Sequence, residues 1–144
     1  QTYFFKLKTS DHIVMNDISQ AKNYSLGIVR GDIYEMLVRR LGFVTDKNLL
    51  LFSEADSFMR LFFKKRIDLI IGSDFTIDHQ TEPFGYTRDD LVKLKQIHVD
   101  ELKGNYIGFN KAASPVVVKR FNQALEQLKA ESGYEAYIKR YVKN

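Results

Sequence analysis

The stretch that most constrains this chain is "KKRIDLIIGSD", from Lys64 to Asp74. Its apolar run carries one charged residue, Asp68, and stops abruptly at Gly72-Ser73-Asp74. A short, nearly continuous apolar run bounded by turn residues is typical of a strand buried on both faces. Such strands occur mainly in parallel sheets that helices cover on each side.

Strand and helix patterns alternate along the rest of the sequence. Strands are predicted over residues 2–7, 24–29, 48–52, 67–71, 91–99 and 106–109. Helical spacing of apolar residues predicts helices over 33–41, 55–66, 75–80, 115–132 and 134–142. Ser53 and Asp56 have the spacing of a capping box, and Ser114-Pro115 has that of an N-cap followed by an N1 proline. Strands that alternate with helices favour an α/β fold with a parallel sheet covered on both faces.

Composition excludes several classes of protein. The chain has 144 residues, enough for one domain with a sizeable core, and it contains no cysteine. Disulfides, thiol catalysis and cysteine-ligated zinc are therefore excluded. The formal net charge of +4 is a mild excess that indicates a solvated surface rather than a nucleic-acid partner. No apolar run approaches the roughly 20 residues of a membrane-spanning helix.

Polar residues follow two of the predicted strands. Arg30-Gly31-Asp32 comes after residues 24–29, and Gly72-Ser73-Asp74 comes after residues 67–71. Ligands of open α/β sheets bind beyond the carboxyl ends of the strands. The candidate ligand-binding residues are therefore Arg30, Gly31, Asp32, Gly72, Ser73 and Asp74. The alternative interpretation, that both segments are simple turns with helix N-caps, stays open at this point.

Catalysis, a metal site and a cofactor are not expected. His12, His79 and His98 stand far apart and lack metal-ligand spacing. Asp89-Asp90 lies in a polar turn, where a solvated pair of acids is the simpler interpretation. "GIVRGD" lacks the glycine spacing of a dinucleotide fingerprint.

Four segments in order resemble the second half of the extracytoplasmic solute-binding proteins of family 3. These segments are "YSLGIVRGD", "KKRIDLIIGSD", "NYIGFNKAASP" and "FNQALEQLKAESGYEAYIKRYV". Within them, "KRID" is similar to the family's G/K-R-x-D element, and "GYEAYIKRY" is similar to its C-terminal signature. Members of the family are two-lobed receptors for amino acids and similar small polar solutes, and they usually serve ABC importers.

The resemblance implies a type II periplasmic-binding-protein lobe, with a three-layer, open, mostly parallel sheet. Residues 1–12 would hold the first hinge strand, 13–105 the second lobe, and 106–144 the return hinge strand with C-terminal helices. Those helices would pack on a first lobe that is absent from this sequence. The implied function is a periplasmic solute receptor whose partners include the membrane subunits of an ABC transporter. A ligand-sensing domain of a signalling protein is the alternative, and an enzyme on the same fold is a third.

The chain departs from the family at two candidate positions. Asp32 stands where the family commonly has Ser or Thr, which helps to hold a ligand carboxylate at a helix N-terminus. Amino-acid binders carry an Asp at or near Ser73 for the ligand's α-amino group, whereas the acid here is Asp74. We therefore predict that Asp32 disfavours ordinary α-amino acids as ligands, and the identity of the solute stays open.

The C-terminal segment has an apolar stripe that the absent lobe would cover. The stripe comprises Val117, Phe121, Leu125 and Leu128, with Tyr137 and Ile138 beyond them. Exposed apolar area of this kind is unusual on a soluble monomer. The helices either fold back onto their own lobe or pack against a second copy, and the second outcome predicts a homodimer of the isolated chain.

Overall fold

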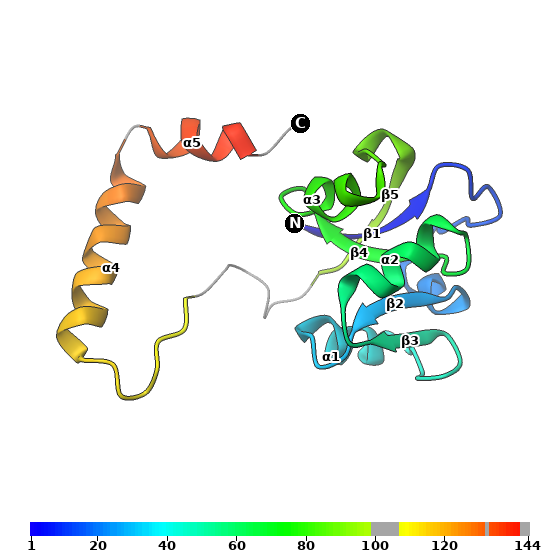
Figure 1. Cartoon of the computed structure of the whole chain (residues 1–144), viewed down its shortest axis with the longest axis horizontal. Helices are drawn as coiled ribbons and strands as arrows, with labels where there is room; N and C mark the ends of the chain where they lie inside the picture. The colour runs from blue at the N-terminus through cyan, green and yellow to red at the C-terminus, as the bar shows by residue number, and fades with distance from the viewer. Residues whose placement is uncertain (99–106, 132, 142–144) are drawn as a thin grey trace. The chain divides into compact units, whose positions relative to one another are not determined.

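The structure is a computed structural model that describes residues 1–98, 107–131 and 133–141 (Figure 1). The chain divides into two units, Gln1–Val99 and Asp100–Asn144.

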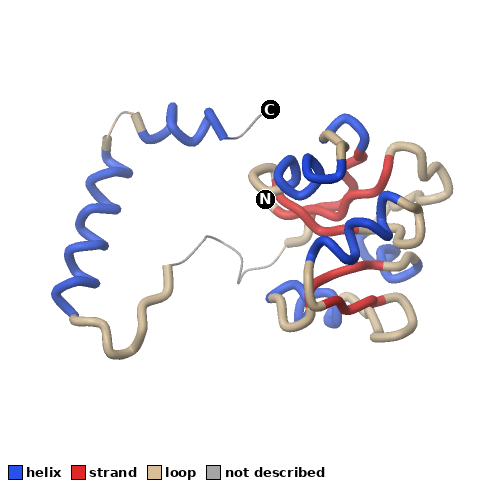
Figure 2. The backbone as a smooth tube through the Cα atoms, in the orientation of Figure 1, coloured by secondary structure: helices blue, strands red, loops and turns tan. Residues whose placement is uncertain are grey.

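The first unit alternates strands and helices, as the sequence predicts (Figure 2). Its strands are β1 (Thr2–Leu7), β2 (Leu26–Val29), β3 (Leu49–Phe52), β4 (Ile70–Ser73) and β5 (Leu91–Gln96). Its α-helices are α1 (Ile33–Arg40), α2 (Ala55–Phe63) and α3 (Ile77–Thr81). Three 3-10 helices complete it: η1 (Ile18–Asn23), η2 (Glu82–Phe84) and η3 (Arg88–Asp90).

Four of the five strands that the structure describes in the first unit point the same way. β2 pairs in parallel with β3, and a parallel bridge between Leu26 and Leu69 joins β2 to the segment that leads into β4. β1 lies between β4 and β5 and runs antiparallel to both. β5 therefore has the direction of β4, so the prediction of a mostly parallel sheet is confirmed.

Each face of the strands packs into its own core, which gives the three layers that the sequence predicts. In β1, Phe4 and Phe5 point to opposite faces and belong to different cores, as the two-residue period of a strand requires. The core on the side of α1 and η1 includes Ile13, Ala21, Leu26, Ile28, Val38, Leu49, Leu69 and Ile71. The core on the side of α2 and α3 includes Phe58, Met59, Phe62, Ile67, Ile70, Ile77 and Leu91.

The lone Asp68 of the apolar run fastens the amino ends of two strands. Its Oδ2 accepts hydrogen bonds from the Ser25 amide at 2.9 Å and the Ser25 hydroxyl at 2.7 Å. The Asp68 amide in turn donates to Ser25 Oγ at 3.0 Å. Because Ser25 precedes β2 and Asp68 precedes β4, these bonds hold the two strand entrances together.

The N-terminus of α1 is capped by carboxylates of its own chain. Asp32 is the N-cap, and its Oδ1 accepts a hydrogen bond from the Tyr34 amide at 3.2 Å. Glu35 Oε2 accepts from the Gly31 amide at 2.8 Å, and Glu35 Oε1 accepts from Arg39 Nη2 at 2.7 Å. The bond from Gly31 and then those from Arg39 hold the pKa of Glu35 below its ordinary range.

Two predictions about the ends of elements are wrong. The capping box at Ser53 is not formed, because α2 begins at Ala55 with Glu54 as an N-cap that makes no side-chain capping bond. Ile107–Phe109 do not form the predicted return hinge strand, and Tyr106 lies outside the described residues.

In the part of the second unit that the structure describes, the helices are α4 (Pro115–Ala130) and α5 (Tyr134–Tyr141). Ser114 is the N-cap of α4 with Pro115 in its first turn, as predicted, although Ser114 makes no side-chain capping bond. The rings of Phe109 and Phe121 meet edge to face at 5.4 Å. Val142, the last residue of the predicted final helix, lies outside the described residues.

Substitution of Gly27 by Ala should destabilise the first unit. A Cβ at this position would lie 2.8 Å from Phe58 Cβ and 3.0 Å from Ile67 Cδ1, so α2 would have to move away from β2. Overpacking of this kind costs about 1–3 kcal/mol. Urea unfolding measures the change, with Gly108→Ala as the control because nothing lies within 4 Å of its Cβ. Equal stability of the two variants would contradict the close approach of α2.

Substitution of Glu35 by Gln should reduce the acid sensitivity of folding. A carboxyl whose pKa is lowered by folding stabilises the fold at pH values above its unfolded pKa, and that contribution is lost as the pH falls through the folded pKa. Urea unfolding across the acid range should therefore show a shallower decline for the variant. Glu54→Gln is the matched control, since Glu54 makes no capping bond. A parallel decline in all three proteins would count against the role of Glu35.

Candidate functional site

The two predicted site segments lie at the same edge of the sheet. β2 and the segment leading into β4 are joined in parallel at Leu26 and Leu69. Arg30 and Ser73 stand the same number of residues beyond this bridge, so both mark the carboxyl ends of neighbouring parallel strands. This edge, with its two turns at residues 30–32 and 72–74, is called the strand-end edge below.

The turn after β2 presents a cation and a capping carboxylate. The Arg30 side chain is exposed and makes no hydrogen bond or ion pair with another described residue, whereas Asp32 is half-buried. Gly31 has φ +76°, and nothing lies within 4 Å of a Cβ built on it. A glycine is favoured here by the left-handed backbone, and Asp32 serves as the N-cap that the simpler interpretation predicts.

Gly72 is a packing residue in this structure. It is buried, and a Cβ there would lie 2.9 Å from Ile77 Cδ1 and 3.0 Å from Gln80 Oε1. The missing side chain is thus needed for the approach of α3 to β4. The sequence analysis instead placed this glycine among the candidate ligand-binding residues.

Ser73 begins a hydrogen-bonded turn. Its hydroxyl lies 3.0 Å from Thr76 Oγ1 and accepts a bond from the Phe75 amide at 3.3 Å. The side chain is half-buried at the strand-end edge. It therefore offers an uncharged hydroxyl at the strand-end edge.

Asp74 is engaged by cations from two other elements. Lys93 of β5 pairs with its Oδ1, and Arg88 of η3 donates to its carbonyl oxygen at 2.7 Å. Arg88 also pairs with Asp78 at 3.1 Å, and Lys93 lies 4.5 Å from the centre of the Tyr3 ring. These partners come from distant parts of the sequence, which is why spacing along the chain did not find them.

Two exposed apolar side chains flank the turns of the strand-end edge. Phe75 follows Asp74 and is 45% exposed, and Ile33 follows Asp32 and is 46% exposed. Sequence reasoning placed Ile33 on a helical face and Phe75 in a helical turn, and assigned neither to the site. Only solvent exposure, which the sequence does not give, distinguishes them from core residues.

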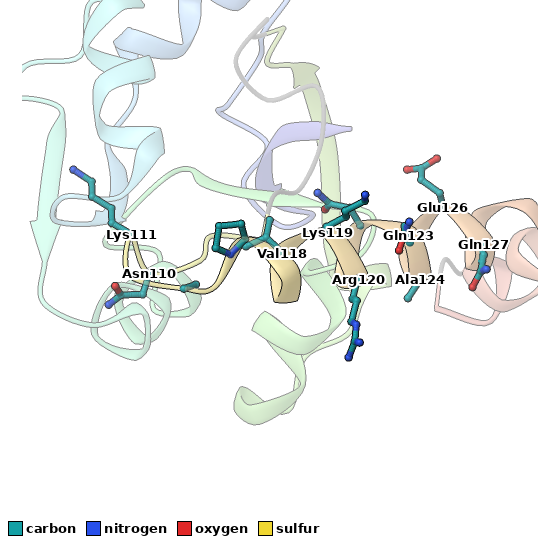
Figure 3. A pocket seen from close by; sticks show the side chains of 12 residues that line it. Asn110, Lys111, Val118, Lys119, Arg120, Gln123, Ala124, Glu126 and Gln127 are labelled. Atoms are coloured by element: carbon teal, nitrogen blue, oxygen red, sulfur yellow. The ribbon is translucent and has the colours of Figure 1, made fainter.

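Other parts of the described chain are weaker candidates for a functional site. No group of acidic and histidine side chains among the described residues could hold a metal ion. A shallow groove lies along most of α4 and the turn before it, and Figure 3 shows that its walls come from the second unit alone. Its polar lining consists of solvent-facing residues such as Lys111, Arg120 and Gln127.

None of the helices in the described part of the chain has the length and apolar character that crossing a bilayer requires.

Comparisons with known proteins identify the fold. No protein-family model and no curated protein matches the chain. Among solved structures, an ancestral arginine-binding protein bound to glutamine is similar, with a TM-score of 0.69, 14% identity, and coverage of 97% of this chain and 58% of that protein. A periplasmic binding protein of Salmonella typhimurium with high arginine specificity is also similar, with a TM-score of 0.69 and 14% identity. The match covers 99% of this chain and 60% of that protein.

A histidine kinase sensor domain with similarity to periplasmic binding proteins also matches, with a TM-score of 0.68 and 14% identity over 98% of this chain and 58% of that domain. The chain thus spans about 60% of the length of these structures. These likenesses confirm the fold that the sequence resemblance implied: the chain has the fold of part of a periplasmic binding protein.

Proposed function

We propose that the chain is part of an extracytoplasmic receptor for a small polar solute, and that the strand-end edge forms one wall of its binding cleft. The observation that carries the proposal is the alignment of the turns after β2 and β4 at one edge of the sheet. Ligands of open α/β sheets bind beyond the carboxyl ends of parallel strands. The similar solved structures are amino-acid-binding proteins and a sensor domain, which supports a binding role.

In this proposal the wall is made by the six residues of the strand-end edge. Arg30, Gly31 and Asp32 line it from β2, and Gly72, Ser73 and Asp74 line it from β4. Arg30 has a guanidinium without a partner among the described residues, so it is the side chain best placed to contact a solute. Gly72 and Asp74 shape the wall without a free side-chain group of their own. Gly72 allows α3 to pack closely on β4, and the Asp74 carboxylate is paired with Lys93.

A free receptor of an ABC importer is the first form of this function. Such a receptor would be periplasmic and would deliver its solute to the membrane subunits of the transporter. A substrate-binding domain of a putative amino acid ABC transporter from Streptococcus pneumoniae, with a TM-score of 0.57, supports this form. Neither catalysis nor a nucleic-acid partner is part of the proposal.

A ligand-sensing domain of a signalling protein is the second form. The histidine kinase sensor domain matches as well as the transport receptors do, so the fold favours neither. The two forms share the same wall and differ in what is attached to it. A membrane-spanning segment encoded in the same gene would identify the sensor.

Solute binding should raise the stability of a protein that carries this chain together with the rest of the fold. A ligand at about a hundred times its Kd adds about 2.7 kcal/mol to the free energy of unfolding. Thermal shifts over a panel of amino acids, amines, organic acids and short peptides measure it. Arg30→Glu should weaken the response, whereas Lys47→Glu, just before β3 at the opposite edge, should not. A stabilisation that Arg30→Glu leaves unchanged would contradict the proposed wall.

The 144-residue chain alone should respond weakly to the same panel. One wall leaves a solute open to water, whereas a good site buries most of its ligand. Two-lobed receptors reach that burial by hinge closure. A thermal shift of this chain as large as that of the two-lobed protein would show that the second lobe is not needed.

The chain alone should also self-associate through α4. Val117 and Leu128 are largely exposed, and Phe121 is 42% exposed, so α4 carries apolar area that we expect a partner to cover. In the two-lobed protein that partner is the first lobe, and in the isolated chain it is a second copy. Light scattering with size-exclusion chromatography should show a dimer that Phe121→Asp disrupts and the control Asn122→Asp does not. A monomer at high concentration would refute this homodimer.

A further inference from the structure

Two carboxylates of the chain itself occupy amides at and just before the beginning of α1. The first amides of a helix lack partners within the helix, which is why helix N-termini attract anions. Here the Tyr34 amide donates to Asp32 Oδ1 at 3.2 Å, and the Gly31 amide donates to Glu35 Oε2 at 2.8 Å. A solute carboxylate that bound these two amides would have to displace the side-chain carboxylates of Asp32 and Glu35.

The charges around this turn do not favour a solute carboxylate either. Glu35 is held in its ionised form by the Gly31 amide and by Arg39, which keep its pKa low. Arg30 also contributes to lowering that pKa, so its positive charge acts on Glu35. Two cations, Arg30 and Arg39, thus face two carboxylates, Asp32 and Glu35. The turn has no excess of positive charge to offer an anion.

The neighbouring turn after β4 does not supply the partner for an α-amino group that the family resemblance would lead one to expect. Ser73 is uncharged, and the Asp74 carboxylate is paired with Lys93. Arg88 lies 3.8 Å from the same carboxylate oxygen. The Asp74 carboxylate is therefore held by two cations of the chain, which makes it a poorer partner for a positively charged solute group.

The second oxygen of Asp32 is available as an acceptor at this edge. Asp32 uses Oδ1 to cap α1, and its second oxygen, Oδ2, makes no hydrogen bond with another described residue. Resting on the proposed receptor function, we propose that the solute presents to this lobe a nitrogen donor without negative charge, such as an amine, a guanidinium or an amide. Asp32 Oδ2 accepts its hydrogen bond, and any carboxylate of the solute is held elsewhere.

Small probes test this preference without knowledge of the natural solute. Acetate, methylammonium and acetamide are titrated at constant ionic strength into the two-lobed protein, and the amide resonances of Gly31, Tyr34 and Ser73 are followed by NMR. Methylammonium or acetamide should shift them saturably, and acetate should not. The difference between methylammonium and acetamide tells whether the solute group is cationic or neutral.

The double substitution Asp32→Ser with Glu35→Ala should open the helix terminus to acetate. Serine caps a helix nearly as well as aspartate does, so α1 stays capped while two negative charges are lost. Acetate should then bind about tenfold more tightly or better. Asp32→Ser alone is the milder variant should the double variant fail to fold. Asp46→Asn is the control, because Asp46 precedes β3 at the opposite edge and its φ of +62° suits asparagine.

The outcomes separate this inference from the proposed function. A saturable shift of the Gly31 and Tyr34 amides by acetate in the unmodified protein would overturn the inference and leave the edge as a binding wall. Failure of acetate to bind the opened variant would also overturn it. Absence of any shift with all three probes would overturn the proposed wall itself.

Discussion

The attachment of β2 to β4 is the interaction on which the rest of the first unit depends. The two strands share a single backbone bridge, and the carboxylate of Asp68 reinforces it by accepting two hydrogen bonds from Ser25. A carboxylate inside an apolar run is costly unless its oxygens are paired, and here they are. Without this attachment the β2–β3 pair and the β4–β1–β5 sheet would be separate, and the turns after β2 and β4 would not share an edge.

The fold could be predicted from the sequence because its signals are local. Continuous apolar runs such as Ile67–Ile71 and helical spacing such as Phe58, Met59 and Phe62 depend only on neighbours in the chain. The direction of β1 could not be read in this way, because a strand's period is the same for parallel and antiparallel pairing. The return strand near Ile107 was mispredicted for a related reason, since strand formation depends on a partner that the pattern does not contain.

The candidate site was predicted less completely than the fold. Strand ends and turn residues identified Arg30 and Ser73 as neighbours, and the parallel bridge agrees with that placement. The partners of Asp74 could not be predicted from the sequence, because Lys93 and Arg88 belong to later elements of the chain. The capping of α1 by Asp32 was visible as an alternative, whereas the second carboxylate, Glu35, was not considered. Whether these residues bind a solute stays a prediction.

The antiparallel direction of β1 also places the start of β1 and the end of β5 at the same edge of the sheet. β1 begins and β5 ends at the strand-end edge, because Thr2 pairs with Ser73 and Tyr3 pairs with Gln96. The amide of Ile97 donates to the Thr2 carbonyl at 2.9 Å, which holds the entering and leaving chains side by side. The Ser73 turn therefore shares its edge of the sheet with the first residues of β1 and the last residues of β5. A solute bound at that turn would lie beside both of these segments.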